Sequence, residues 1–259
     1  MTDPDRRFWD SYWANSPPTL TEATMTRVLD RAKLGYLRRA LPPSGLTLEV
    51  GAGSGRLSCF LAMAGYRTVC LDYSFPALGA ARANYAVARV PGSFVAGDAF
   101  RLPFQDGAFD VVLSTGLLEH FEQPTPIVGE MVRVLRRGGL FYSDIVPKKF
   151  SLFRSLDWLG RLKRLVAGRR DSPPTFYERS FTSAEIHAML TSSGLVETRV
   201  FAAGVIPPYL PLIYRWKRLR TLQVRLVERT QGLWRRLDGT WLAEKLGFYY
   251  FACGNKPDA

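Results

Sequence analysis

The sequence predicts an α/β fold in which a mostly parallel sheet is covered by helices on both faces. Short apolar and β-branched runs alternate with helix-like segments between residues 45 and 146. The first of these runs leads into a glycine-rich turn that opens a helix. A chain of 259 residues with 47% hydrophobic side chains can bury one substantial core. We therefore expect a single domain over residues 1–259.

The elements of this core are expected in a regular order. Strands are predicted at 46–50, 68–71, 93–96, 109–114 and 140–146, with helices at 57–64, 76–88 and 125–135. A helix at 183–191 and strands at 196–202 and 248–253 complete the pattern. Because only short helices precede the last strand, we expect it to be antiparallel.

Two segments interrupt this pattern, at 147–181 and 207–246. In both, apolar residues recur at helical spacing with cations between them, from 152 to 165 and again through Leu219, Leu222, Leu226, Leu233 and Leu237. We expect two basic amphipathic helical insertions that form a lid. The remaining parts are then a helical cap (1–44), a ligand-binding core (45–146), a second piece of core (182–206), and the final strand with its tail (247–259).

The net charge of +12 is unevenly distributed. Residues 1–150 carry a net charge of +3, whereas residues 151–259 carry +9. Such a bias suggests an anionic partner, which would be a nucleic acid, an acidic membrane surface or an acidic substrate. The alternative is that the cations serve solubility alone.

The cysteines and the N-terminal residues bear on the compartment. Cys59, Cys70 and Cys253 are far apart and have no metal-ligand spacing, so we expect no metal and a reduced, cytoplasmic protein. The first residues lack the apolar core of a signal peptide, and no apolar run approaches about 18 residues. We expect a protein that is not exported by that route and does not span a membrane, although it could bind the inner face of one peripherally.

The glycine-rich turn predicts a ligand. Gly51, Gly53 and Gly55 follow the spacing G-x-G-x-G, and Arg56 stands where a dinucleotide fingerprint would have its last glycine. Bare main chain leaves room for a ligand, and the free amides at the start of the next helix point toward it. The pattern favours an adenosine-containing cofactor other than a dinucleotide. The alternative is a tight turn without a ligand, and the absent G-K-[ST] argues against a nucleoside triphosphate.

Acidic residues lie at or just after the ends of the first three strands. Asp72 closes the second strand, where a carboxylate can accept from both hydroxyls of a ribose, or else serve as a helix N-terminal carboxylate. Asp98 is placed for an adenine amine, beside a backbone amide and an apolar wall from Ala99 and Phe100. Glu49 either accepts from the loop amides or faces a cationic group. All of them converge on the carboxyl edge of the sheet.

Five motifs in one order carry a resemblance to a family. They are residues 48–56, 71–72, 97–110, 118–121 and 133–140. Together they resemble class I S-adenosylmethionine-dependent methyltransferases, and among these the small-molecule and quinone-biosynthesis-like subgroup. The resemblance is strong over residues 45–146 and weak in the later core. It implies a Rossmann-like seven-stranded sheet whose last strand is antiparallel, with S-adenosyl-L-methionine as cofactor and S-adenosyl-L-homocysteine as product.

The resemblance also assigns residues to the cofactor. The glycine turn would pass under its methionine part, Asp72 would hold the ribose, Asp98 the adenine amine, and residues 115–117 would lie near the sulfonium. Residues 8–13 resemble an aromatic helix that closes over the cofactor, where an aromatic face attracts a cation, although this helix could also merely cap the core. The expected cofactor-binding residues are Tyr12, Trp13, Glu49, Gly51, Ala52, Gly53, Gly55, Asp72, Tyr73, Asp98, Ala99, Phe100, Thr115, Gly116 and Leu117.

A catalytic base is sought at the same edge. Methyl transfer depends on aligning the acceptor and the methyl group in a water-poor pocket, and a base helps when the acceptor is a weak acid. His120, just beyond the fourth strand, is the first candidate. Glu119 is the second and Asp144 a weaker one. The alternative is that His120 only orients the acceptor or holds its loop.

We expect methyl transfer to an O or C atom of a small, hydrophobic or membrane-associated acceptor. A quinone precursor, a prenyl lipid or a glycolipid would fit, because the tryptophans and arginines of the insertions suit an anionic bilayer. Two alternatives stay open. One is an RNA methyltransferase that uses the basic C-terminal half, which ranks lower because no added RNA-binding module is present. The other is a non-catalytic cofactor-binding scaffold. The oligomeric state is not predicted.

Overall fold

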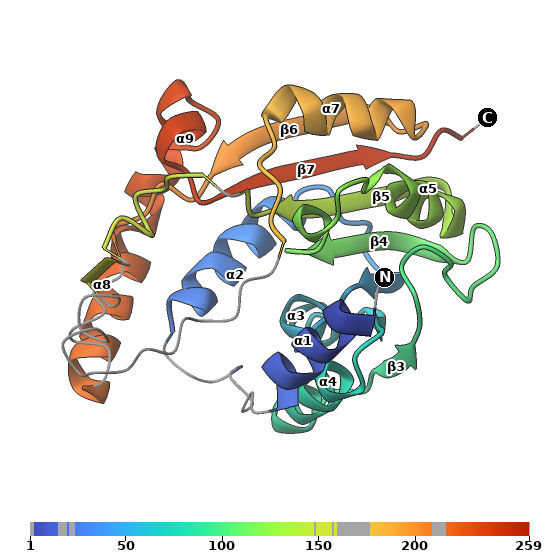
Figure 1. The fold of residues 1–259 in the computed structure, drawn as a ribbon, viewed down its shortest axis with the longest axis horizontal. Helices are drawn as coiled ribbons and strands as arrows, with labels where there is room; N and C mark the ends of the chain where they lie inside the picture. The colour runs from blue at the N-terminus through green and yellow to red at the C-terminus, as the bar shows by residue number, and fades with distance from the viewer. Residues whose placement is uncertain are drawn as a thin grey trace.

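The computed structural model describes residues 3–14, 20, 24–147, 149–156, 158–159, 177–208 and 216–258. Within them, seven strands form one sheet in the order β3-β2-β1-β4-β5-β7-β6 (Figure 1). The strands are β1 (Leu46–Val50), β2 (Arg67–Asp72), β3 (Ser93–Ala96), β4 (Phe109–Thr115), β5 (Leu135–Ile145), β6 (Val196–Ala203) and β7 (Tyr249–Asn255). β7 is antiparallel to both neighbours, and the pairs among β1 to β5 are parallel. The expected sheet is confirmed.

Helices cover both faces of this sheet. They are α1 (Asp3–Ala14), α2 (Met25–Leu37), α3 (Arg56–Met63), α4 (Phe75–Ala88), α5 (Thr125–Val134), α7 (Ser183–Ser192), α8 (Lys217–Trp234) and α9 (Trp241–Leu246), with short 3-10 helices η1 (Leu118–His120) and η2 (Arg235–Leu237). One apolar cluster packs α5 and α7 on one face, and two others pack α2, α3 and α4 on the opposite face. α1 lies against α4 (Figure 1).

The predicted element bounds agree with these to within about two residues, with one exception. β5 begins at Leu135 rather than at the expected residue 140. Leu135 pairs with Phe109, and after a register shift the ladder resumes at Leu140 opposite Val111. The side chain of Lys256 donates to the carbonyl oxygens of Val132 and Leu135 at 2.8 Å each, which fixes the backbone where α5 meets β5.

The alternation of side chains along the strands decides which polar groups meet which helices. Leu48 and Val50 point toward α5 and α7, so Glu49 between them points toward α3. In β5, Phe141 and Ile145 point toward the face covered by α5 and α7. Asp144 points toward the opposite face, where it contacts α2. Two carboxylates at the carboxyl edge therefore lie on the same side of the sheet.

The two interruptions differ from the expectation in part. The helix predicted over 152–165 is wrong for its first residues, because 152–156 form a turn. Residues 157 and 160–176 lie outside the described residues. In the second interruption, α8 confirms the amphipathic helix, yet it packs on α2 through Val224 and Val227 rather than through its leucines. None of the described helices is long and apolar enough to cross a membrane.

Candidate functional site

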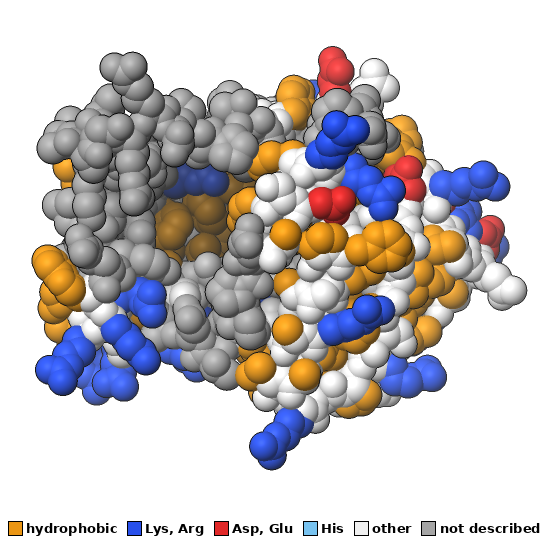
Figure 2. Space-filling model, turned by 60° about the horizontal axis from the view of Figure 1, so that its bottom comes forward, with side chains coloured by type: hydrophobic (Ala, Val, Ile, Leu, Met, Phe, Trp, Pro, Cys, Tyr) orange, Lys and Arg blue, Asp and Glu red, His pale blue; other side chains and the backbone are white. Residues whose placement is uncertain are grey.

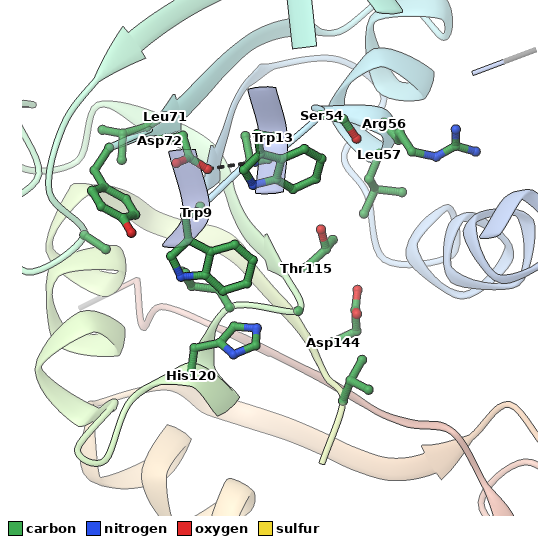
Figure 3. Close-up of a pocket in the computed structure, with 18 of the residues that line it drawn as sticks. Trp9, Trp13, Ser54, Arg56, Leu57, Leu71, Asp72, Thr115, His120 and Asp144 are labelled. Atoms are coloured by element: carbon green, nitrogen blue, oxygen red, sulfur yellow. Dashed lines mark hydrogen bonds between the residues drawn. The ribbon is translucent and has the colours of Figure 1, made fainter. Parts of the chain in front are cut away.

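A cavity lies at the carboxyl ends of β1, β2, β4 and β5, between α1 and α2 (Figure 3). Most of the predicted cofactor residues line it, namely Trp13, Gly51, Ala52, Gly53, Asp72, Tyr73, Asp98, Ala99, Thr115, Gly116 and Leu117. His120 lines it as well. Tyr12, Glu49, Gly55, Phe100 and Glu119 do not. Most of the predicted residues therefore lie around one cavity. The structure distinguishes those that line it from those that do not.

The glycine turn needs glycine for two different reasons. Gly51, Gly53 and Gly55 have φ angles of +64°, +53° and +60°, in the left-handed region that strains other residues. A Cβ at Gly53 would lie 2.6 Å from the ring of Trp13, and one at Gly51 would lie 2.5 Å from Leu117. At Gly55 it would instead lie 3.0 Å from Cβ of Ala81, and thus in the core. Bare backbone at the first two positions forms a cradle under the cavity.

Asp72 joins the glycine turn to the start of α4. Its Oδ2 accepts from the backbone N–H of Gly53 at 2.8 Å (Figure 3). Its Oδ1 accepts from the backbone N–H of Ser74 at 2.9 Å. Burial raises the pKa of the carboxyl group, although these N–H donors oppose the shift. The hydroxyl of Ser74 donates to Asp10 of α1 at 2.6 Å. One carboxylate thus fixes the end of β2, the turn and, through Ser74, the helix above them.

The end of β3 differs from the prediction in one residue. Asp98 and Ala99 line the cavity, and Oδ1 of Asp98 accepts from the backbone N–H of Phe100 at 3.0 Å. Phe100 itself lies outside the lining and is exposed. Its ring packs edge-on against Phe121, with 5.3 Å between the ring centroids. Phe121 lines the cavity. The apolar wall that was expected from Phe100 is therefore formed by Phe121, and Phe100 packs against that ring.

Glu49 takes the first of its two predicted roles. It is fully buried, its Oε2 accepts from the backbone N–H of Ser58 at 3.1 Å, and its Oε1 accepts from the hydroxyl of Thr115 at 3.0 Å. Burial raises the pKa of Glu49 to about 7. Because it does not line the cavity, the prediction that it faces a cationic ligand group is not supported. It holds Thr115 in the cavity wall instead.

Helix α1 covers the cavity with tryptophans. Trp9 and Trp13 line it, being four residues apart and therefore on one face of the helix. Tyr12 points away, is 52% exposed, and packs edge-on against Trp13 at 5.0 Å. Tyr12, predicted as a cofactor residue, therefore does not line the cavity, whereas Trp9, which was not predicted, does. The i, i+4 spacing of the two tryptophans was the signal in the sequence.

His120 lies on the side of the cavity away from the glycine turn (Figure 3). Its Nδ1 donates to the carbonyl oxygen of Tyr177 at 3.0 Å, which places the lone pair of the neutral ring on Nε2. Burial lowers the pKa of His120, so the ring is neutral near pH 7. The ring of Trp9 packs edge-on against it, with 4.9 Å between centroids. A neutral imidazole in a cavity wall can accept a proton.

Glu119 is a support rather than a wall. It is 1% exposed, and its Oε1 accepts from the backbone N–H of Val146 at 3.0 Å. Burial raises the pKa of Glu119 to about 8, so its carboxyl group is largely protonated near neutral pH. The bond ties η1 to the end of β5. Its position does not favour contact with an acceptor.

Sequence reasoning missed two buried ion pairs at the cavity. Nζ of Lys33 lies 2.7 Å from Oδ1 of Asp144, and Nη2 of Arg56 lies 2.8 Å from Oδ2 of Asp30. All four residues line the cavity, and all four side chains are nearly buried. Although burial opposes its charge, Asp144 and Asp30 hold the pKa of Lys33 above its usual value. Asp30 and Lys33, three residues apart within a predicted helical cap, were the available signal.

The described part of the second insertion does not form the expected lid. No residue of α8 or α9 is among those that line the cavity. The helix above the glycine turn is α1, which is tied down by the bond between Asp10 and Ser74. Because α8 buries Val224 and Val227 against α2, and α2 lines the cavity, α8 lies one helix away from the cavity.

Known proteins share this architecture and part of this sequence. Residues 48–143 match the model of a methyltransferase domain. A demethylmenaquinone methyltransferase of Renibacterium salmoninarum is 34% identical over 138 residues, which cover 52% of this chain and 56% of that protein. A ubiquinone/menaquinone biosynthesis C-methyltransferase of Roseobacter denitrificans is 34% identical over 137 residues, which cover 48% and 54%. The chain spans about half the length of these relatives.

A solved structure extends the likeness to the rest of the fold. The phosphoethanolamine N-methyltransferase 2 of Haemonchus contortus, in complex with S-adenosyl-L-methionine, aligns with a TM-score of 0.56 at 17% identity. The alignment covers 88% of this chain and 52% of that one. In the present structure, the sheet order and the antiparallel last strand agree with the resemblance in the sequence. Residues 48–143 thus match a methyltransferase domain, and the fold of the chain is similar to that of an S-adenosyl-L-methionine-binding methyltransferase.

Proposed function

We propose that this protein transfers the methyl group of S-adenosyl-L-methionine to an O or C atom of a small apolar acceptor. The observation that carries the proposal is that one cavity has two chemically different sides. A glycine cradle with Asp72 and Asp98 lies on one side, and His120 lies on the other. The quinone-biosynthesis relatives, which are 34% identical over about half of this chain, support an apolar acceptor.

The residues of the cavity fit the cofactor chemically. Gly51 and Gly53 offer bare backbone, where a side chain would collide with Leu117 or Trp13. The carboxylate of Asp72 can accept from ribose hydroxyls, and that of Asp98 can accept from an adenine amine. The tryptophans of α1 supply aromatic surface suited to a sulfonium cation. We therefore propose the cavity-lining residues named above as the cofactor site, with Glu49, Gly55 and Phe100 as its supports.

The proposed chemistry needs little from the protein beyond placement. When bound, S-adenosyl-L-methionine supplies an electrophilic methyl group on a sulfonium. The chain aligns the acceptor with that group and excludes water by means of Trp9, Trp13 and Phe121. Nε2 of His120 takes the proton of a weakly acidic acceptor, and the carbonyl oxygen of Tyr177 holds the ring in the required tautomer. Glu119 acts by fixing the loop that carries His120.

The ion pair of Lys33 and Asp144 offers a polar contact on the acceptor side. Tyr142 donates to the second oxygen of Asp144 at 3.1 Å, so this carboxylate is held from two directions. An apolar acceptor with a single hydroxyl or carbonyl group would place that group near the pair and its carbon skeleton against Phe121 and Val146. We propose that such an acceptor is membrane-borne.

Two measurements test the proposal. Isothermal titration should give saturable binding of S-adenosyl-L-methionine, weakened about 10- to 100-fold in Asp72→Asn because hydrogen bonds to a charged group are worth about 1.5–3 kcal/mol. Val87→Glu, an exposed site on α4, is the matched control and should bind normally. Incubation of labelled cofactor with fractionated cell extract should place the label in the lipid fraction. Label in RNA would favour the RNA alternative, and binding without any transfer would favour the scaffold.

A further inference from the structure

We propose that α8 carries a solvent-facing leucine stripe that docks the protein on an anionic lipid bilayer. The stripe consists of Leu219, Leu222, Leu226 and Leu233. The inference deepens the proposed function, on which it rests for the location of the acceptor, but the docking itself is measured without the enzyme reaction.

Helix α8 is apolar on two opposite faces. Its inner face buries Val224 and Val227 against α2, with 0% and 2% of each residue exposed. In an 18-residue helix of 3.6 residues per turn, the leucine stripe falls on the side away from these valines. Leu222, Leu226 and Leu233 are 64%, 61% and 59% exposed. A surface helix normally presents polar residues outward, so this stripe needs a partner.

The partner must be anionic, because cations border the stripe. Arg218, Arg225 and Arg229 lie on the same flank of the helix, next to the leucines, and all three are exposed. The single acidic residue of α8 is Glu228. It faces α2, where Nη2 of Arg27 lies 3.0 Å from its carboxylate. The carboxylate of Glu228 is therefore engaged by α2. Figure 2 shows cationic and hydrophobic side chains gathered at the edge where α8 lies.

A bilayer fits this combination better than a second copy of the chain. Apolar side chains that enter the acyl region with guanidinium groups at the phosphates are the usual arrangement of an interfacial helix. An antiparallel two-fold pairing of two stripes would place the two arginine rows close to each other, and like charges at an interface are unfavourable. Charge complementarity thus selects the lipid.

The stripe is connected to the cavity by one helix. α8 packs on α2, and a salt bridge joins Arg27 of α2 to Glu228. The same helix α2 contributes Thr26, Asp30 and Lys33 to the cavity. A bilayer held by the outer face of α8 is therefore separated from the proposed acceptor side by two helices, α8 and α2, on the side of the sheet where Asp144 points.

Cosedimentation with extruded vesicles tests the docking. We expect the full chain to bind phosphatidylcholine vesicles that contain 30 mol% phosphatidylglycerol, as a choice of probe typical for anionic surfaces, and to bind pure phosphatidylcholine at least tenfold more weakly. Leu222→Glu/Leu226→Glu should lose at least tenfold in binding to the anionic vesicles. Met63→Glu/Val87→Glu, which places the same charges at exposed apolar sites of α3 and α4, should bind as the wild type does.

The outcomes separate docking from the reaction. Equal binding by the leucine variant and the control variant overturns the inference, as does equal binding to neutral and anionic vesicles. A lipid-free dimer that Leu222→Glu/Leu226→Glu dissociates also overturns it, in favour of a second copy of the chain. Titration with S-adenosyl-L-methionine and circular dichroism confirm that each variant folds. A leucine variant that binds the cofactor normally but does not bind the vesicles supports docking. If the wild type does not bind S-adenosyl-L-methionine, the proposed function is contradicted, but the docking is not.

Discussion

The cavity and helix α8 break the usual rule of burial in opposite directions. At the cavity, ions and carboxyl groups are buried, among them Lys33, Asp144 and Glu49. On α8, large leucines are exposed. Buried polar groups and exposed apolar patches are the two informative departures from an ordinary surface and core. The first indicates a site built for a ligand inside the fold, and the second indicates a surface built for a partner outside it.

Removing a cation should have very different effects in the two regions. Lys33→Ala leaves Asp144 buried without its partner, which should lower the free energy of unfolding by about 3–5 kcal/mol. Arg225→Ala on α8, an exposed site, should change it by less than about 0.5 kcal/mol. Urea denaturation of both variants measures the contrast. Similar losses in the two would mean that the buried pair is no more important for stability than a surface charge.

The next largest effect is expected on catalysis. His120→Gln should lower kcat about 100-fold or more, the lower end of general-base catalysis, with little change in cofactor affinity. Because burial lowers the pKa of His120, wild-type kcat/KM should be level around pH 7–8 and should fall only at acidic pH. The His120→Gln profile should lack that acidic limb. Full turnover by the variant would show that His120 only orients the acceptor.

The core was predictable because its signals are local. The turn at Gly51 to Gly55, the carboxylates after β2 and β3, and the alternation of strands all appear within short stretches of sequence. The supports were not predictable in the same way. Whether Glu49 lines the cavity or stands behind it depends on Thr115, 66 residues away, and the pairing of Lys33 with Asp144 spans 111 residues.

The insertions were harder for a different physical reason. The periodicity over α8 predicted an amphipathic helix correctly, but its leucines were expected to belong to a lid. Two smaller valines, Val224 and Val227, are buried instead. A helix with apolar residues on two faces does not specify from sequence alone which face meets the core. The answer depended on α2, about 200 residues earlier in the chain.

Two glycine substitutions are expected to change stability by smaller amounts and in opposite directions. Gly53→Ala introduces a Cβ at a φ of +53° and at 2.6 Å from Trp13, so it should lower stability by about 1–2 kcal/mol and weaken cofactor binding. Gly232→Ala lies within α8 with no atom within 4 Å of the added Cβ. It should raise stability by roughly 0.5–1 kcal/mol. Thermal unfolding of both variants would contradict this contrast if the two shifts had the same sign.

The last comparison concerns the pH dependence of stability. Burial raises the pKa of Glu119 from about 4.5 in the unfolded chain to about 8 in the folded one. Between these values the folded state binds the proton more tightly, so folding stability contributed by this group is present below about pH 4.5 and is lost as the pH rises toward 8. Glu119→Gln keeps the shape of the neutral acid and should flatten that decline. The melting temperature of the variant should then vary less between pH 5 and 8 than that of the wild type.

Glu122→Gln, three residues along on the exposed loop, is the control and should leave the slope unchanged. If both variants keep the wild-type slope, Glu119 is charged in the folded protein, and the bond between its carboxyl group and Val146 would then hold η1 as a carboxylate rather than as a neutral acid.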